Sequence, residues 1–513
     1  MRAWTCHKGV VYLGRISTQR INLSASTGRT PLMQQLSGLD TVFLNLETNA
    51  VPMHIGSLAI IDPGAAGPDF GFESVRRLIE RRLHLLPMFR RRLMTTPLGL
   101  DQPYWIEDPD FDIESHVRHR ALPRPGTLKQ LNDLVCDVMS IRLDRSMPLW
   151  KVYYVEGLEG GKVALVSKIH HACIDGVSGS ELFSTLLDVT PQPREVAPPD
   201  APWIPDELPP PLKLSLITAR NFLARPGKIY KLARRTIPLV LEVRREAMAR
   251  QQATRRASTV DADTNRKPTV MAPRMRFNTT ITARRSYASG SLSLKDIKLV
   301  KNAFGVSLND VVLGICAEAL RNYLLAGKEL PDRPLIAAVP MSVRGNGERG
   351  GNRISMLRAA LATDIADPVE RLQALSAKMV GVKRTMKAIP ASLMLDWAHT
   401  PPPSVMAQAA RLYENFSIQD LVHPPFNLVI SNVPGPKLPL YLDGAKVEAH
   451  YPISIPYHGL ACNITVFSYQ DSLDVGITAH RGTVPDVEVI MEGMAAALAQ
   501  LKHRAQQQLR KAG

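Results

Sequence analysis

Two adjacent histidines, His170 and His171, are the residues of this chain whose type and spacing most clearly suggest chemistry. Asp175 and Gly176 follow shortly after the second histidine. An imidazole can accept and return a proton near neutral pH, so the pair fits general acid–base catalysis. The aspartate and glycine are typical of a turn, in which the carboxylate is free to pair with a cationic side chain.

The flanking sequence predicts where these histidines lie. Residues 161–169 alternate in polarity, with Val163 and Ile169 on one face, and therefore indicate a strand. Ser178 and Glu181 have the spacing of a capping box, which predicts a helix from Ser178. Because neighbouring side chains of a strand point to opposite faces, we expect one histidine to be structural and the other to be available for chemistry.

The histidine pair with its aspartate and glycine resembles the HHxxxDG motif of the CoA-dependent acyltransferase superfamily. Pro148, Leu149 and Trp150, which precede the strand leading to the motif, match a Pro-Leu-Trp motif of one branch. That branch is the bacterial wax ester synthase/diacylglycerol acyltransferase family, and the resemblance extends from Met33 to about Leu501.

The resemblance implies a role for each motif residue. His171 would be the general base, while His170, Asp175 and Gly176 would maintain the structure of the motif. A later helix starts with Asn309 and Asp310. Asn309 would contact an oxyanion or the substrate, and Asp310 would hold the local structure. Substrate contacts are also expected from Pro148, Leu149 and Trp150.

The same resemblance implies an α/β fold with two chloramphenicol-acetyltransferase-like lobes, mixed sheets and an active site at their interface. The implied reaction is direct transfer of a long acyl chain from acyl-CoA to diacylglycerol, forming triacylglycerol. Acyl-CoA would be a co-substrate, and no permanently bound cofactor and no metal are expected. Two alternatives remain open: a wax ester synthase that uses long-chain fatty alcohols, and a non-catalytic lipid-binding relative.

Other reactive sites fit the sequence less well. Residues 176–180 read Gly-Val-Ser-Gly-Ser, which is out of register with the G-x-S-x-G nucleophile motif. Adjacent histidines lack the one-face spacing of an H-E-x-x-H zinc site. Cys173 lies in the motif without a separate base, so we interpret it as structural.

Composition limits the class of protein and its partners. The 513 residues are 45% hydrophobic and carry a formal net charge of +16. This charge favours anionic partners, of which CoA phosphates and anionic lipid rank above nucleic acid, since no nucleic-acid motif is present. Five scattered cysteines indicate small buried thiols in a reducing compartment. No apolar run is long enough to predict a membrane-spanning helix.

The chain is expected to divide into five segments. Residues 1–32 read as a flexible leader, 33–190 as an N-terminal lobe and 271–505 as a C-terminal lobe, followed by a basic tail over 506–513. Residues 191–270 join a proline-rich linker to a basic helical segment, 212–256. That segment fits a helix at an anionic membrane surface and a solvated connector about equally. We therefore expect a cytoplasmic protein associated peripherally with a membrane or lipid inclusions.

Overall fold

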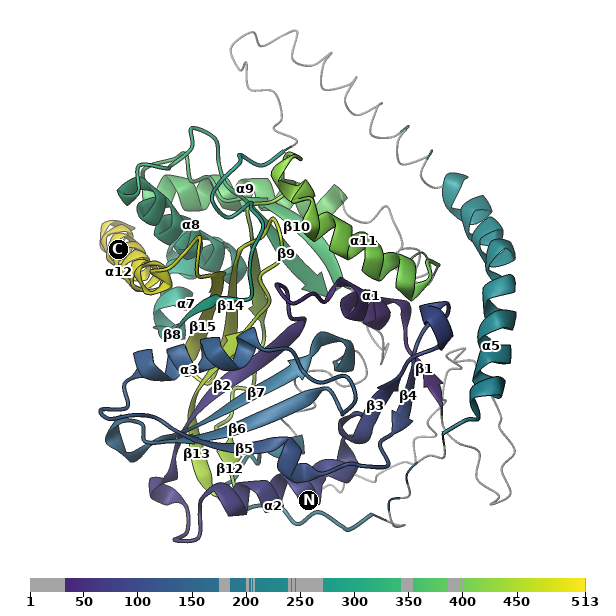
Figure 1. Ribbon diagram of the computed structural model, residues 1–513. Helices are drawn as coiled ribbons and strands as arrows, with labels where there is room; N and C mark the ends of the chain where they lie inside the picture. Colours follow the sequence, from purple (N-terminus) through teal and green to yellow (C-terminus); the bar gives the residue numbers. More distant parts are fainter. Residues whose placement is uncertain are drawn as a thin grey trace, which may run out of the picture.

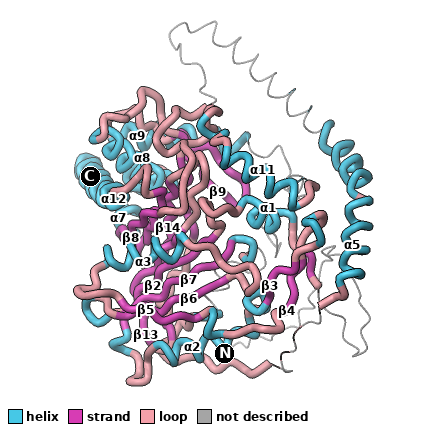
Figure 2. The backbone as a smooth tube through the Cα atoms, in the orientation of Figure 1, coloured by secondary structure: helices cyan, strands magenta, loops and turns pink. Residues whose placement is uncertain are grey.

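The fold is built on two six-stranded mixed sheets, seen side by side in the computed structural model (Figure 1; Figure 2). The structure describes residues 33–174, 185–199, 203, 205, 208–238, 241, 245, 271–342, 354–385, 397 and 400–512. The predicted leader, the turn at Asp175 and Gly176, and the helix start at Ser178 lie outside these residues.

The N-terminal sheet contains, in spatial order, β12 (Tyr441–Leu442), β13 (Ala445–Ile453), β2 (His54–Asp62), β7 (Val163–His170), β6 (Trp150–Glu156) and β5 (Val117–Ala121). Only β5 and β6 run parallel within it. β12 and β13 come from the C-terminal part of the chain, so this sheet is completed by residues far beyond the predicted boundary at 190.

The second sheet contains β10 (Ile354–Ala360), β9 (Ile336–Ser342), β11 (Leu428–Val433), β14 (Cys462–Tyr469), β15 (Ser472–His480) and β8 (Arg285–Ser293). β11 is parallel to both of its neighbours, and the other pairs are antiparallel. β14 and β15 are consecutive and form an antiparallel hairpin. A small third sheet joins β1 (Gln34–Gln35), β4 (Tyr104–Glu107) and β3 (Arg91–Met94).

Helices cover the sheets and begin where polar caps occur in the sequence. Thr127 caps α3 (Leu128–Ser140), Ser293 caps α7 (Leu294–Phe304) and Ser307 caps α8 (Leu308–Ala326). In each case the hydroxyl accepts a backbone N–H that has no partner within the helix. The other helices are α1 (Gly38–Leu46), α2 (Phe72–Arg82), α5 (Pro211–Leu223), α9 (Pro368–Thr385), α11 (Pro403–Asn415) and α12 (Val487–Ala512).

The large apolar core of the second half lies between its sheet and helices α7, α8, α9 and α12. In the first half, α3 and α2 cover opposite faces of the N-terminal sheet. α3 also packs on β8 and so joins the two halves. There the Ser289 hydroxyl donates to Asn132 Oδ1 at 2.9 Å.

Three element boundaries concern the arginine-rich and basic parts of the chain. Helix α2 ends at Arg82, and β3 begins at Arg91. Most of the basic tail expected over 506–513 continues helix α12, as far as Ala512, because Ala, Gln, Lys and Arg are all strong helix formers. In the basic helical segment, α5 ends at Leu223, and helix resumes over 225–238 after a single turn residue, Ala224.

Within the described residues, no single helix has the length and hydropathy of a membrane span. Taken together, α7 and α8 pass that test, but they meet at a bend of 104°. Their apolar side chains form much of the core of the second half.

Candidate active site

The histidine pair lies where β7 turns into a short 3₁₀ helix, η7 (His171–Cys173). Backbone pairing fixes both histidines: His170 N donates to Leu149 O at 2.9 Å, and His171 N donates to Met53 O at 2.8 Å. His170 Nδ1 accepts the Ala172 N–H at 3.1 Å and so caps η7. β7 therefore ends at His170, η7 begins at His171, and the two rings lie in different environments.

His170 is fully buried and has a structural environment. Since its Nδ1 accepts a hydrogen bond, the neutral ring carries its proton on Nε2. That nitrogen lies 3.7 Å from Glu47 Oε1. Burial lowers the pKa of His170 to about 3, against the opposing attraction of the Glu47 charge. This packing leaves the His170 side chain without exposed surface.

His171 keeps part of its surface exposed. Phe43 of α1 stacks on the imidazole, with ring centroids 3.8 Å apart and planes inclined by 22°. Burial lowers the pKa of His171 to about 4, while its own backbone carbonyl acts in the opposite direction. The ring is therefore neutral at pH 7, in the protonation state that a general base requires.

Glu47, immediately after α1, is a buried carboxylate that the sequence interpretation missed. Arg145 Nε and Nη2 both donate to Glu47 Oε2, at 2.9 and 2.6 Å. Oε1 lies 3.3 Å from His54 Nε2, which also receives the Leu143 N–H at 3.2 Å. His54 is thus held through contacts at Nε2, while its buried Nδ1 has no hydrogen-bond partner among the described residues.

The charges around Glu47 keep it ionised. Burial alone would raise its pKa, but the contact with His54 and the charges of His170 and Arg145 lower it to about 2. A signal for this residue was present in the sequence: Glu47 follows Phe43 by four positions and therefore lies on the same side of α1. The C-terminal end of α1 thus supplies a neighbour of each histidine of the pair: Phe43 contacts His171, and Glu47 lies beside His170.

Leu149 and Trp150 lie in the core between β6, β7 and the elements around α2. Trp150 Nε1 donates to Phe89 O at 2.7 Å, and its ring stacks on Phe89 and His116. Pro148 is also buried. The burial of these side chains gives no support to the expected substrate contact, and instead assigns the motif to supporting β7.

Asn309 and Asp310 separate into two roles. Asp310 completes the cap of α8, since its carboxylate accepts the Ser307 N–H and the Ser376 hydroxyl, each at 3.0 Å. Asn309 Oδ1 accepts from Asn432 Nδ2 at 3.4 Å. Asn432 is the penultimate residue of β11 and is a further polar group beside Asn309.

In the described part of the chain, neither a reactive cysteine nor a metal-binding cluster is present. Cys136, Cys173, Cys316 and Cys462 are free and buried, as predicted. Burial raises the pKa of the Cys173 thiol well above its ordinary value. No group of three or more histidine, cysteine or carboxylate side chains there has the geometry to hold a metal ion.

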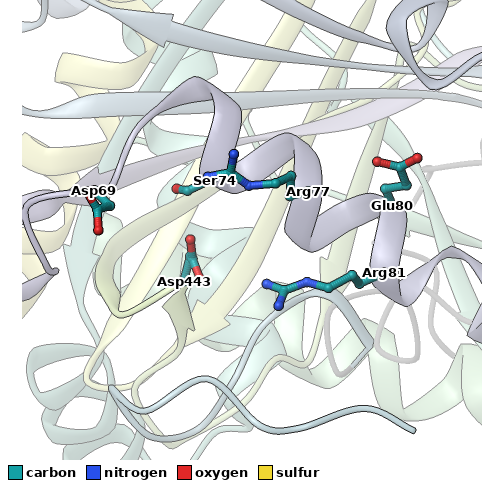
Figure 3. Close-up of a pocket in the computed structure, with 6 residues that line it drawn as sticks. All are labelled: Asp69, Ser74, Arg77, Glu80, Arg81 and Asp443. Atoms are coloured by element: carbon teal, nitrogen blue, oxygen red, sulfur yellow. The ribbon is translucent and has the colours of Figure 1, made fainter. Parts of the chain in front are cut away.

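A charged hollow of about 560 Å³ lies between α2 and the β12–β13 turn (Figure 3). Its lining mixes both signs of charge: Asp69, Ser74, Arg77, Glu80, Arg81 and Asp443. β2 begins at His54, opposite His170, and ends at Asp62, beside this turn. Eight strand steps separate the two ends, roughly 26 Å, so the hollow is remote from the histidines.

Comparison with known proteins gives the family. The model of the wax ester synthase/diacylglycerol acyltransferase catalytic domain matches residues 36–312, and that of the WS/DGAT C-terminal domain matches residues 350–502.

The chain belongs to this family.

Curated relatives of the family match almost the whole chain. A Mycobacterium tuberculosis protein named "Probable diacyglycerol O-acyltransferase tgs2" is 37% identical over 469 residues, which cover 90% of this chain and 97% of the relative. The Acinetobacter baylyi "O-acyltransferase WSD" is 34% identical over 465 residues, covering 90% and 95%.

Solved structures support the same family and fold. The wax ester synthase/diacylglycerol acyltransferase of Marinobacter aquaeolei matches with a TM-score of 0.64 at 30% identity, covering 92% of this chain and all of that one. A trichothecene 15-O-acetyltransferase of Fusarium sporotrichioides, 12% identical with a TM-score of 0.53, shares the fold over 93% of this chain and 96% of its own. The expected mixed α/β fold and the O-acyltransferase family are therefore confirmed.

Proposed function

We propose that this family member transfers a long acyl chain from acyl-CoA to the free hydroxyl of diacylglycerol, forming triacylglycerol. The observation that carries the proposal is His171: a neutral, partly exposed imidazole at a strand end, held by backbone pairing and by the Phe43 ring. The name of the tgs2 relative, which matches over nearly its whole length, supports diacylglycerol as the acceptor.

In the proposed reaction the base is His171 Nε2, because Nδ1 is buried. Nε2 removes the hydroxyl proton of the acceptor as its oxygen attacks the thioester carbonyl carbon. The tetrahedral intermediate then collapses, the carbon–sulfur bond breaks, and the protonated imidazole returns its proton to the CoA thiolate. The products are the new ester and free CoA, without an acyl-enzyme.

The remaining groups are proposed to position the reactants. Asn309, paired with Asn432, would donate a hydrogen bond to the oxyanion or to the substrate. His170 keeps the η7 turn in place through its cap, and Asp175 and Gly176 are proposed to complete the turn. Acyl-CoA is then a substrate and not a resident cofactor.

A second acceptor class is favoured by the family itself. The Marinobacter relative, 30% identical, is named for wax ester synthesis as well as diacylglycerol acylation. The same base would activate a long-chain fatty alcohol by the same steps. Because both acceptors dissolve in lipid rather than water, we also propose that the enzyme works in the cytoplasm, attached to an anionic membrane or lipid-inclusion surface.

The decisive experiment incubates purified protein with labelled acyl-CoA and separate diacylglycerol and fatty-alcohol acceptors, and resolves the products by chromatography. The change His171→Ala should lower kcat by about 10²–10⁴-fold, the usual contribution of a general base. The matched control is His119→Ala, a surface histidine paired with Glu156. Unchanged synthesis of both esters by folded His171→Ala protein would rule out the assignment.

A further inference from the structure

The helix that begins with α5 and resumes over 225–238 is attached to the protein by polar side chains. Asn221 Nδ2 donates to Asp101 Oδ2 at 2.6 Å, and Arg225 Nη2 lies 3.3 Å from Asp101 Oδ1. Thr218 and Arg225 are buried. Farther along, the Trp397 indole donates to the Thr236 hydroxyl at 2.9 Å. The inward side of this helix therefore combines these polar anchors with Leu214, which packs against an apolar cluster that includes Tyr104.

The outward side of the same helix is apolar. Four large side chains recur every seven residues with exposures of 64, 77, 68 and 56%: Leu216, Leu223, Tyr230 and Ile237. A seven-residue step returns to within about 20° of the same direction on an α-helix, so these side chains form one outer stripe. Thr218 and Arg225 lie two positions from members of the stripe, a rotation of about 200°.

In a usual amphipathic helix the apolar side faces the core and the polar side faces water, whereas this helix also carries large apolar side chains on the side that faces away from the protein. Single exposed leucines are common on protein surfaces, whereas an ordered apolar stripe along a whole helix indicates a surface that is covered by something else. Figure 1 shows α5 in teal at the edge of the molecule, away from both sheets, where such a covering surface has access.

The charge of the helix indicates what covers it. Residues 211–241 contain no aspartate or glutamate and carry these cations: Lys213, Arg220, Arg225, Lys228, Lys231, Arg234 and Arg235. All of them except Arg225 are exposed. An outer apolar stripe flanked by cations fits the boundary between anionic headgroups and acyl chains. A second copy fits poorly, since two such helices would place like charges together.

Further exposed apolar side chains lie between this helix and the histidines. η4 (Pro97–Gly99) packs on both α5 and α11 and carries Leu98, which is 83% exposed. Leu412 and Phe416, at the end of α11, are exposed as well. α11 packs on α1, and α1 packs on η7. A lipid surface at the outer stripe would therefore lie on the side of the molecule from which α1 leads to His171.

We propose that the outer stripe of helix 211–238 docks the enzyme on an anionic lipid surface and thereby presents lipid acceptors to the site at η7. Docking would bring the enzyme to its lipid acceptors, so the purpose of the outer stripe rests on the proposed acyl transfer. The test of docking does not depend on that function. Binding to vesicles that contain no substrate measures it directly.

The experiment is co-flotation of the full-length protein with vesicles of phosphatidylcholine alone, or of phosphatidylcholine and phosphatidylglycerol in equal parts. The wild-type protein should prefer the anionic vesicles, and added salt should weaken its binding. The triple variant Leu216→Gln, Leu223→Gln, Tyr230→Gln should lower the partition coefficient by roughly 100-fold, because three apolar side chains no longer leave water. The control triple Ile141→Gln, Leu325→Gln, Leu509→Gln removes apolar groups elsewhere that are 68, 54 and 49% exposed, and it should change binding less than 2-fold, about the precision of the assay.

A second variant tests the cations independently. Changing Lys228, Lys231, Arg234 and Arg235 to glutamine should remove the preference for anionic vesicles, a loss of roughly 1000-fold on those vesicles alone. Thermal unfolding of each variant checks that the protein is folded. His171→Ala protein should float like the wild type, so a failure of the acyl-transfer proposal is distinguishable from a failure of docking.

Two results would overturn the proposal. One is equal flotation of the outer-stripe variant and the wild type. The other is a wild type that ignores both kinds of vesicle but forms dimers by light scattering that the outer-stripe variant loses, which would assign the stripe to a second copy.

Discussion

Replacing Glu47 with glutamine tests whether the buried carboxylate positions the catalytic turn. The change keeps the shape of the side chain but removes its charge. Oε2 accepts two N–H groups from Arg145, and Oε1 faces the Nε2–H of His170. An amide cannot accept on both sides, because one of its two terminal atoms is a donor. Glu47→Gln must therefore lose either the arginine contact or the histidine contact.

The expected loss of stability follows from those contacts. A hydrogen bond to a charged group contributes about 1.5–3 kcal/mol. Arg145 is 41% exposed on its side chain and can regain water, so the full penalty of a stranded buried charge does not apply. We expect Glu47→Gln to lower the free energy of unfolding by about 2 kcal/mol, measured by urea denaturation at pH 7.5.

The pH dependence of this difference has a definite sign. The pKa of Glu47 is lowered from 4.5 to about 2 in the folded protein. Its stabilising contribution is thus complete above about pH 4.5 and is lost as the pH falls toward 2. The difference between wild type and variant should stay constant from pH 6 to pH 8.

Catalysis should respond separately from stability. A displaced η7 turn moves His171, so kcat should fall by about 10–100-fold while KM for acyl-CoA stays the same. The control is Glu73→Gln, which removes an exposed carboxylate paired with Arg76 and should cost less than about 0.5 kcal/mol. If Glu47→Gln matches the wild type in both kcat and urea midpoint, the carboxylate does not position the turn.

Three further predictions concern stability. Trp150→Phe keeps the stacking but removes the Nε1–H bond to Phe89 O, so the free energy of unfolding should fall by about 1 kcal/mol with an unchanged KM; a raised KM would favour substrate contact instead. Lys168→Met removes donors to Val138 O and Ile141 O near the end of α3 and should cost about 2 kcal/mol in urea denaturation; a loss below 0.5 kcal/mol would contradict that role. Burial is the chief reason that the pKa values of His54 and His170 are lowered to about 4 and about 3. The unfolded chain therefore binds more protons below pH 6.5, and the free energy of unfolding should fall from there toward pH 4, by about 2 kcal/mol per histidine at pH 5. A flat urea midpoint over this range would refute the burial argument.

Local patterns in the sequence were sufficient to predict the elements that carry the histidines. The strand before His170 and the caps at Ser293 and Ser307 depend on residues that are close in sequence. These signals arise from backbone periodicity and from unpaired N–H groups at helix starts, which a short window contains. Strand alternation predicts only that one of His170 and His171 is structural, and the choice of His171 as the base comes from the resemblance to the family.

The contacts that tune the site were beyond such local reasoning. Glu47 meets Arg145 and His170 only after α1 and β7 have packed. Arg145 lies 98 residues after Glu47 in the sequence, and His170 lies farther still. The burial of Trp150 likewise depends on Phe89 and His116, which lie on other elements. Composition identified the basic helix after Pro211, but the side that it turns inward is fixed by contacts such as that with Asp101, a distant residue.

The position of β13 has a consequence for how the protein is assembled. The strand at residues 445–453 lies next to β2. The ribosome must therefore synthesise the first strands of the second sheet before the first sheet can be completed. Until then β2 has an unpaired edge, and an open strand edge invites association with other chains. A polypeptide cut in the linker should consequently yield two pieces that recover a native enzyme only when they are mixed, so the two halves are partners in folding rather than separable modules.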